Sequence, residues 1–149
     1  MTVFNLWRRV ASYTVFLQRR LIDAVGPFDE ALGVGSGTQW GGGEDLDYVL
    51  RSLQAGCSVY YDPTLSIHHP QKREHSSHPP ARQGYEYGAG FGRVMRKNRL
   101  PWWFAVYYFA RSFGASGLSL LAGHPRRARF YWAVGKGRVR GWWSENGNG

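Results

Sequence analysis

Three carboxylates stand within four positions in the stretch WGGGEDLDYVLR, residues 40–51, behind a run of three glycines. They are Glu44, Asp45 and Asp47. Glycines let a ligand come close to the backbone, and a carboxylate placed beside them can take a proton from an attacking hydroxyl group. The stretch therefore indicates general-base chemistry. The simpler alternative is a helix N-terminus capped by acids, because negative charge there suits the helix dipole.

A helix must position these carboxylates. From Leu46 onward, apolar side chains recur at i, i+3, i+4 and i+7, which predicts an amphipathic helix that begins near Glu44 and ends at the next glycine. On that helix Asp47 is spaced to pair with Arg51 one turn later. Asp45 is the one carboxylate that this arrangement leaves without a local role.

Short strands are predicted on both sides of this helix, because β-branched and aromatic residues are concentrated in SYTVFLQ (12–18), CSVYYDP (57–63) and LSIHHP (65–70). Helices are predicted at 84–98 and across the apolar segment 100–123. Glycines recur every four residues in the first of them, and this spacing lets another helix approach closely. These glycines are Gly84, Gly88 and Gly92.

The charge is distributed unevenly along the 149 residues. Residues 1–62 hold five basic and seven acidic side chains, whereas residues 63–149 hold fourteen basic and three acidic ones. The basic part should therefore meet something anionic. An anionic membrane surface suits its many Trp and Tyr residues. A solvated basic face on packed helices is the alternative, while the apolar run 101–110 argues against nucleic acid.

Cysteine usage and hydropathy limit the compartment and the membrane topology. The single cysteine, Cys57, excludes an intrachain disulfide and fits a reducing compartment. The first twenty residues do not form a signal peptide, since Arg8 and Arg9 interrupt their apolar stretch. No uncharged run reaches the length of a spanning helix, and 100–123 comes nearest. We therefore expect a cytoplasmic protein that is peripheral at the inner face of the cell membrane.

Four motifs, in this order, resemble the C-terminal half of a family 2 glycosyltransferase catalytic domain of the GT-A type. They are VGPFDEALG, GEDLDYVLR, AGCSVYYDP and HHP, and together they cover roughly residues 12–70. The tail, with YEYGAGFGRVMRKNRLPWW and RRARFYWAVGKGRVRGW, is similar to the basic aromatic tails of bacterial members that act at membranes. The resemblance implies transfer of a hexose-type sugar from a nucleotide sugar to a hydroxyl acceptor, in polysaccharide or glycolipid synthesis, with inversion.

The resemblance also implies catalytic and acceptor-binding roles. In such enzymes the aspartate of the Glu-Asp motif is the general base, which corresponds to Asp45 here, with Glu44 as its motif partner. Trp40 and the glycine loop, represented by Gly42 and Gly43, would border a saccharide or lipid-linked acceptor. Asp47 matches a position that is often acidic in the family and would belong to the same acceptor site. The alternative is that Asp47 has a structural role.

A histidine at the end of the last strand can complete a divalent cation site, for Mg²⁺ or Mn²⁺, in these enzymes. Here that residue is His69, with His68 as the alternative. The two point to opposite faces of a strand, so only one of them could reach the metal. A core or surface histidine is the simpler interpretation of either.

The resemblance implies an α/β fold: the C-terminal portion of a GT-A domain followed by amphipathic, membrane-associated helices. We expect an acceptor-side half over residues 1–83 and a basic aromatic helical tail over 84–149. The donor-binding half of the family, with its Asp-x-Asp after a strand, has no counterpart here. We therefore expect a truncated enzyme that is inactive alone and binds a divalent cation only with a donor half. The alternative is a non-catalytic half that binds a membrane surface or docks to a partner.

Overall fold

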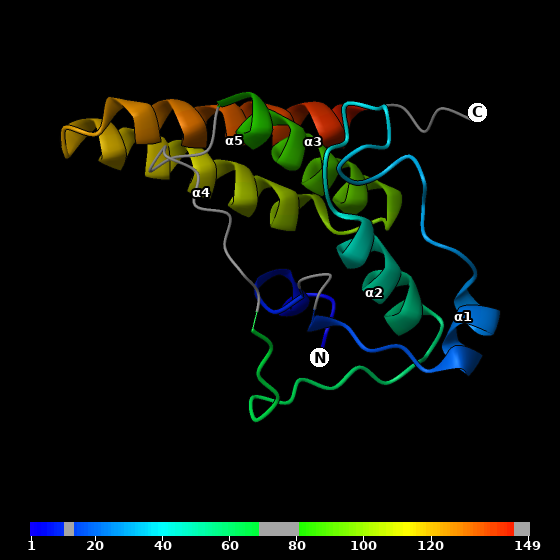
Figure 1. Ribbon diagram of the computed structural model, residues 1–149. Helices are drawn as coiled ribbons and strands as arrows, with labels where there is room; N and C mark the ends of the chain where they lie inside the picture. The colour runs from blue at the N-terminus through cyan, green and yellow to red at the C-terminus, as the bar shows by residue number, and fades with distance from the viewer. Residues whose placement is uncertain (11–13, 69–80, 145–149) are drawn as a thin grey trace. The chain divides into compact units, whose positions relative to one another are not determined.

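The computed structural model describes residues 1–10, 14–68 and 81–144 (Figure 1). Its helical elements are η1 (Leu6–Arg8), α1 (Arg19–Val25), α2 (Glu44–Gln54), α3 (Ala81–Lys97), α4 (Trp102–Leu121) and α5 (Pro125–Trp143). They group into two compact units. The first comprises Met1–Asp29 and Glu44–Glu74, and the second comprises Glu30–Gly43 and His75–Gly149.

The predicted α/β fold was wrong, because the described residues form helices and no strand. The described parts of the three predicted strands, residues 14–18, 57–63 and 65–68, run as irregular backbone without a ladder. Their β-branched and aromatic residues favour extended chain, but a sheet also needs neighbouring strands to accept its hydrogen bonds. The described residues supply no such set of strands, so the composition alone does not produce a sheet.

Helix α2 follows the predicted pattern. It starts at Glu44, and it buries Leu46, Val49 and Leu50 on one face. It ends in a Schellman motif, in which Gly56 has a φ of +79° and the amide of Cys57 donates to the Ser52 carbonyl oxygen at 3.0 Å. The glycine provides the left-handed backbone that this motif requires.

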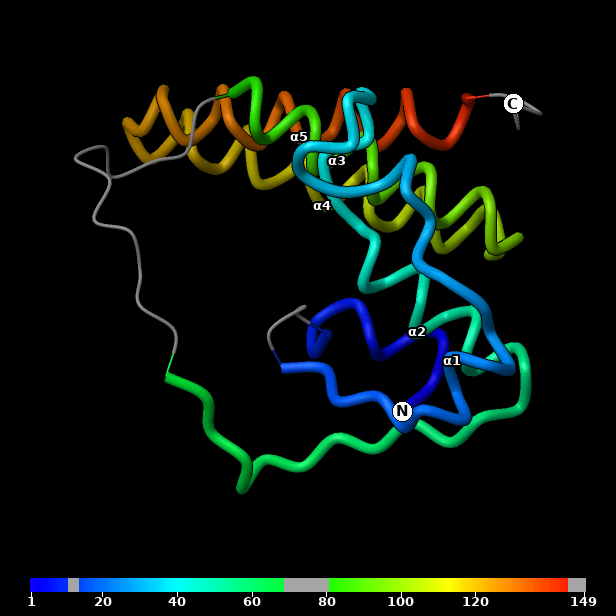
Figure 2. Tube along the Cα trace, turned by 45° about the vertical axis from the view of Figure 1, so that its right-hand side comes forward, coloured from blue at the N-terminus to red at the C-terminus, as the bar shows by residue number. Residues whose placement is uncertain are grey.

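In the second unit, α3 and α5 pack through glycines, as the four-residue spacing predicts (Figure 2). A Cβ atom at Gly88 would lie 2.3 Å from the Val134 carbonyl oxygen, and one at Gly141 would lie 2.0 Å from that of Ala89. Gly84 lies against Phe130 and Gly88 against Val134, so the two helices run in the same direction. Only residues without a side chain allow backbones to approach this closely.

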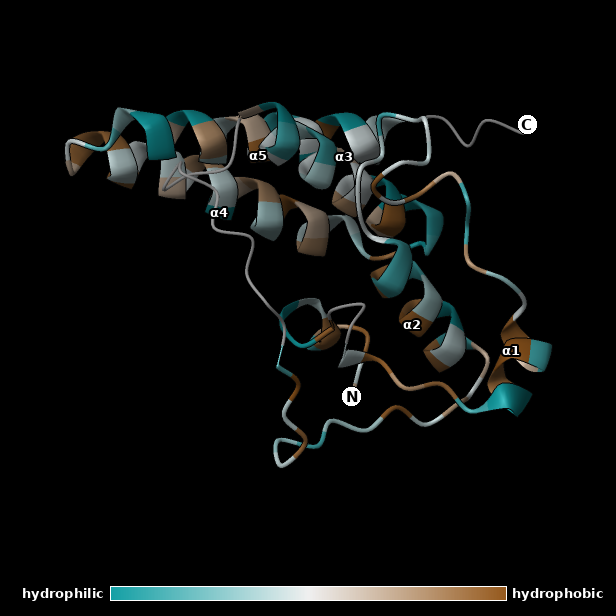
Figure 3. Ribbon diagram, viewed as in Figure 1, coloured by the Kyte–Doolittle hydropathy of each residue, from teal (hydrophilic) through white to brown (hydrophobic). Residues whose placement is uncertain are grey.

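Helix α4 packs against α5 in the opposite direction. The hydroxyl of Ser116 donates to the Ala128 carbonyl oxygen at 2.9 Å, and the Arg138 guanidinium donates to that of Tyr108 at 3.0 Å. Figure 3 shows α4 mainly in pale and brown shades, whereas teal segments recur along α5. No helix in the described part of the chain combines the length and hydropathy needed to cross a membrane.

Candidate functional site

The first turn of α2 holds the predicted base and its motif partner. Asp45 is half-buried, and its Oδ1 accepts a hydrogen bond from the amide of Leu46 at 2.8 Å. Glu44, which opens the helix, is also half-buried. The pair lines a cavity of about 120 Å³ together with Val15, Leu17, Phe28, Tyr48 and Val49. The structure thus brings both predicted catalytic carboxylates to one small, largely apolar pocket.

Tyr48 is a polar group of this pocket that the sequence interpretation missed. Its side chain is 1% exposed and stacks on Phe28 with ring centroids 4.3 Å apart. Its hydroxyl is buried and has no hydrogen-bond partner among the described residues. An unsatisfied buried hydroxyl is costly, which makes it a candidate to bind a ligand oxygen. Helical spacing could have identified Tyr48, because it stands three residues after Asp45.

The third carboxylate of the cluster has a structural role. Asp47 is fully buried, and its Oδ2 lies 2.9 Å from Nε of Arg51. The same guanidinium donates to the carbonyl oxygens of Val25 and Pro27. Arg51 therefore joins α2 to the turn that follows α1, and the predicted i, i+4 ion pair is confirmed. An acceptor-binding role for Asp47 stays a prediction.

The predicted acceptor-side loop belongs to the second unit and packs on α3. The Trp40 indole lies under the Arg93 guanidinium, 5.9 Å from its central carbon. The Gly42 carbonyl oxygen lies 1.9 Å from where a Cβ of Gly90 would stand, and Gly43 has a φ of +100°. These glycines therefore allow the loop to lie directly on α3. Contact of Trp40, Gly42 and Gly43 with an acceptor stays a prediction.

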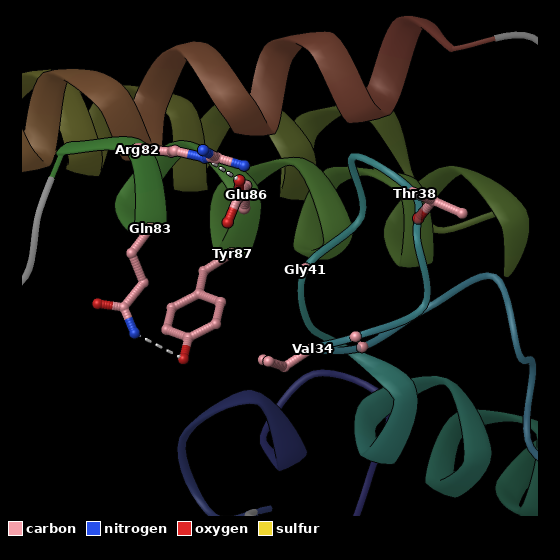
Figure 4. Close-up of a pocket in the computed structure, with 9 residues that line it drawn as sticks. Val34, Thr38, Gly41, Arg82, Gln83, Glu86 and Tyr87 are labelled. Atoms are coloured by element: carbon pink, nitrogen blue, oxygen red, sulfur yellow. Dashed lines mark hydrogen bonds and ion pairs between the residues drawn. The ribbon is translucent and has the colours of Figure 1, made fainter. Parts of the chain in front are cut away.

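A larger cavity of about 260 Å³ lies between this loop and the first turns of α3 (Figure 4). Four of its polar side chains already form two pairs. Arg82 forms an ion pair with Glu86 at 2.8 Å, and the Gln83 amide donates to the Tyr87 hydroxyl at 3.0 Å. Backbone of the glycine-rich segment, including Gly41, forms the opposite wall. Hydroxyl groups of a saccharide could exchange with these exposed hydrogen bonds.

The predicted divalent cation is not matched by a donor set in the described residues. His68 is exposed, and His69 lies outside the described residues. Among the residues that the structure describes, no three His, Cys, Asp or Glu side chains come together as metal ligands. The cation therefore stays a prediction that belongs with a donor half.

Arg138 is a half-buried cation inside the helical unit. It donates to the Tyr108 carbonyl oxygen and to Oγ of Ser112, and it lies over the rings of Phe91 and Tyr108. Burial away from water is the main reason why its pKa is lowered to about 10. Residues 87–144 contain no Asp or Glu, so ring faces and helix oxygens take the place of a counter-ion.

Comparisons with known proteins do not assign a family or a fold to this chain. No protein family, curated protein or solved structure matches this chain.

Proposed function

We propose that the chain carries the acceptor-activating part of a glycosyltransferase, which moves a sugar from a nucleotide sugar to a hydroxyl acceptor in polysaccharide or glycolipid synthesis. One observation carries the proposal: Asp45 lies half-buried in the first turn of α2 and shares a pocket with Glu44 and Tyr48. The resemblance of GEDLDYVLR to the family's base-bearing motif supports the same assignment.

In the proposed reaction, the Asp45 carboxylate takes the proton of the acceptor hydroxyl. The resulting oxygen attacks the anomeric carbon of the donor sugar, and the nucleoside diphosphate leaves from the opposite face, so the configuration inverts. The hydrogen bond from the Leu46 amide holds one carboxylate oxygen in place. A fixed base of this kind contributes roughly a hundredfold or more to the rate.

The pocket is large enough for the reacting end of an acceptor molecule but too small for a whole substrate. Its volume of about 120 Å³ is below the roughly 300–1,000 Å³ of typical ligand pockets. It therefore admits the hydroxyl-bearing end of an acceptor. The Tyr48 side chain lines the same pocket, and we propose that its buried hydroxyl, which has no partner in the described part of the chain, donates to the acceptor oxygen.

The test is a transfer assay in which the chain is combined with a donor-binding half and given radiolabelled nucleotide sugars. Asp45→Asn should lower incorporation of label into membrane and polysaccharide fractions at least about a hundredfold, because the amide cannot accept the proton. The matched control is Asp23→Asn, which changes an exposed carboxylate of α1 in the same unit. It should leave the transfer rate unchanged. Equal rates for the two variants would favour the non-catalytic alternative, a binding or partner-docking half.

A further inference from the structure

Helix α4 has an inverted distribution of polarity. Three of its six buried residues are serines, Ser112, Ser116 and Ser119, and each hydroxyl donates to a backbone carbonyl oxygen. Seven of its large apolar or aromatic side chains are exposed instead, although Phe104 and Tyr108 are buried and Phe113 packs on α5. In a helix packed against protein in water, the apolar side chains would be buried and the serines exposed. The reverse arrangement is typical of helices whose outer face contacts a hydrocarbon phase.

The outward half of α4 is broad and nearly free of charge. On a helical projection its exposed residues span about 180°. Arg111 is the one charged residue in the whole of α4, and it stands at the edge of this half. The exposed large side chains, which we call the α4 outer face, are Trp102, Trp103, Val106, Tyr107, Leu118, Leu120 and Leu121.

The charge of the segment that contains this face has one sign. Residues 87–144 contain eleven Lys and Arg residues and no Asp or Glu. On α5, the exposed residues include Arg126, Arg129, Lys136 and Arg140, together with the exposed indoles of Trp132 and Trp143. A surface that meets these helices must therefore tolerate a dense positive charge, and an anionic one is attracted to it.

We propose that the α4 outer face docks on an anionic lipid surface. Its leucines and valine enter the boundary between headgroups and acyl chains, where exposed apolar area leaves water. Trp102, Trp103 and Tyr107 lie at the headgroup level that amphipathic aromatic rings prefer. Exposed arginines and lysines of the neighbouring helix α5 contact lipid phosphates. This docking is independent of the glycosyl transfer proposed above, because it requires no donor or acceptor.

The positive charge of the segment favours an anionic lipid surface over a second copy of the chain as the partner of the α4 outer face. Two copies that joined through the α4 outer face would bring two segments of the same strong positive charge together, and like charges repel. A lipid surface with phosphate headgroups satisfies both the apolar area and the charge. The face thus fits an anionic membrane better than it fits itself.

Vesicle flotation of the 149-residue chain tests the proposal. At physiological salt the chain should float with vesicles of phosphatidylcholine and phosphatidylglycerol, and much less with phosphatidylcholine alone. The double variant Trp102→Gln/Trp103→Gln should bind the anionic vesicles at least about tenfold more weakly. Both side chains are exposed, at 70% and 51%, so the fold should be retained, as circular dichroism would check.

The matched control is Phe16→Gln/Tyr60→Gln, which removes two exposed aromatic rings from the first unit. It should change vesicle binding less than about twofold. A second variant, Arg126→Gln/Arg129→Gln, should weaken binding to anionic vesicles about tenfold and leave binding to neutral vesicles unchanged.

Three results would overturn the proposal. The first is absence of flotation, and the second is equal flotation with neutral and anionic vesicles. The third is a dimer in light scattering that disappears in Trp102→Gln/Trp103→Gln, because a second copy would then cover the α4 outer face.

Discussion

The guanidinium of Arg51 lies 2.9 Å from the fully buried carboxylate of Asp47, and it also donates to the carbonyl oxygens of Val25 and Pro27. One arginine thus neutralises a buried acid and fixes the turn after α1 against α2. This contact explains why Asp47 belongs to the acidic cluster: it stabilises the helix that carries Asp45.

Removal of Arg51 should therefore destabilise the first unit strongly. Arg51→Met leaves the buried carboxylate without its ion-pair partner, and we expect a loss of about 3 kcal/mol in the free energy of unfolding. Urea denaturation followed by circular dichroism measures this loss. Arg20→Met, which changes an exposed arginine of α1, should cost less than about 0.5 kcal/mol. Similar midpoints for the two variants would show that the ion pair is not structural.

The glycine contact between α3 and α5 makes a second prediction. Gly88→Ala would place its Cβ 2.3 Å from the Val134 carbonyl oxygen, so the helices must separate. We expect a loss of about 2 kcal/mol or more. Gly117→Ala on α4 has no atom within 4 Å of its new Cβ, and it should stabilise by about 0.5–1 kcal/mol because alanine favours helix. Thermal unfolding of both variants should give shifts of opposite sign, and shifts of the same sign would contradict the packing described.

Arg99 ends α3 in a conformation that suits glycine. Its φ is +54°, and its amide and that of Leu100 bond back to the carbonyl oxygens of Arg96 and Met95. The left-handed conformation costs a residue with a Cβ about 1 kcal/mol. Arg99→Gly should therefore raise the unfolding free energy by about 0.5–1 kcal/mol. Arg99→Ala is the control for loss of the side chain, and it should not stabilise. An unstable Arg99→Gly would mean that the arginine side chain stabilises this end of the helix.

The lowered pKa of Arg138 predicts a pH dependence. Its pKa is lowered to about 10 in the folded state, well below that of an ordinary arginine. Below pH 10 both states are charged, and the cost of burying the cation is fully present. Above pH 10 the folded state loses its proton first, so the unfolded state holds more protons and stability rises with pH.

The difference between wild type and Arg138→Met isolates this effect from other groups that titrate at high pH. From pH 9 to pH 11, the wild type should gain about 1 kcal/mol relative to the variant in urea denaturation. A difference that is constant across this range would mean that the pKa of Arg138 is not lowered.

Local patterns in the sequence predicted local structure well. The apolar stripe of Leu46, Val49 and Leu50 correctly predicted where α2 starts and which face it buries. Helical periodicity can be predicted in this way because it depends only on neighbours along the chain. The i, i+4 spacing of Asp47 and Arg51 correctly predicted their ion pair. The four-residue spacing of glycines such as Gly88 predicted a close helix contact, although it did not identify α5 as the partner.

Features that depend on distant partners could not be predicted this way. The strand pattern of CSVYYDP failed because a strand exists only beside another strand. The pocket at Asp45 depends on the stacking of Phe28 on Tyr48, which lie twenty positions apart. The outward face of α4 could not be predicted either, because hydropathy does not show which side of an apolar helix packs on α5.

A comparison of three single variants tests most directly whether Asp45 is the base. Sugar transfer and unfolding free energy should be measured for Asp45→Asn, Glu44→Gln and Asp47→Asn, each combined with the same donor-binding half. We predict that Asp45→Asn loses transfer at least about a hundredfold and keeps its stability, whereas Asp47→Asn loses stability. Glu44→Gln should retain more transfer than Asp45→Asn. If Asp45→Asn transfers sugar as fast as the wild type, Asp45 is not the base and the proposed function is wrong.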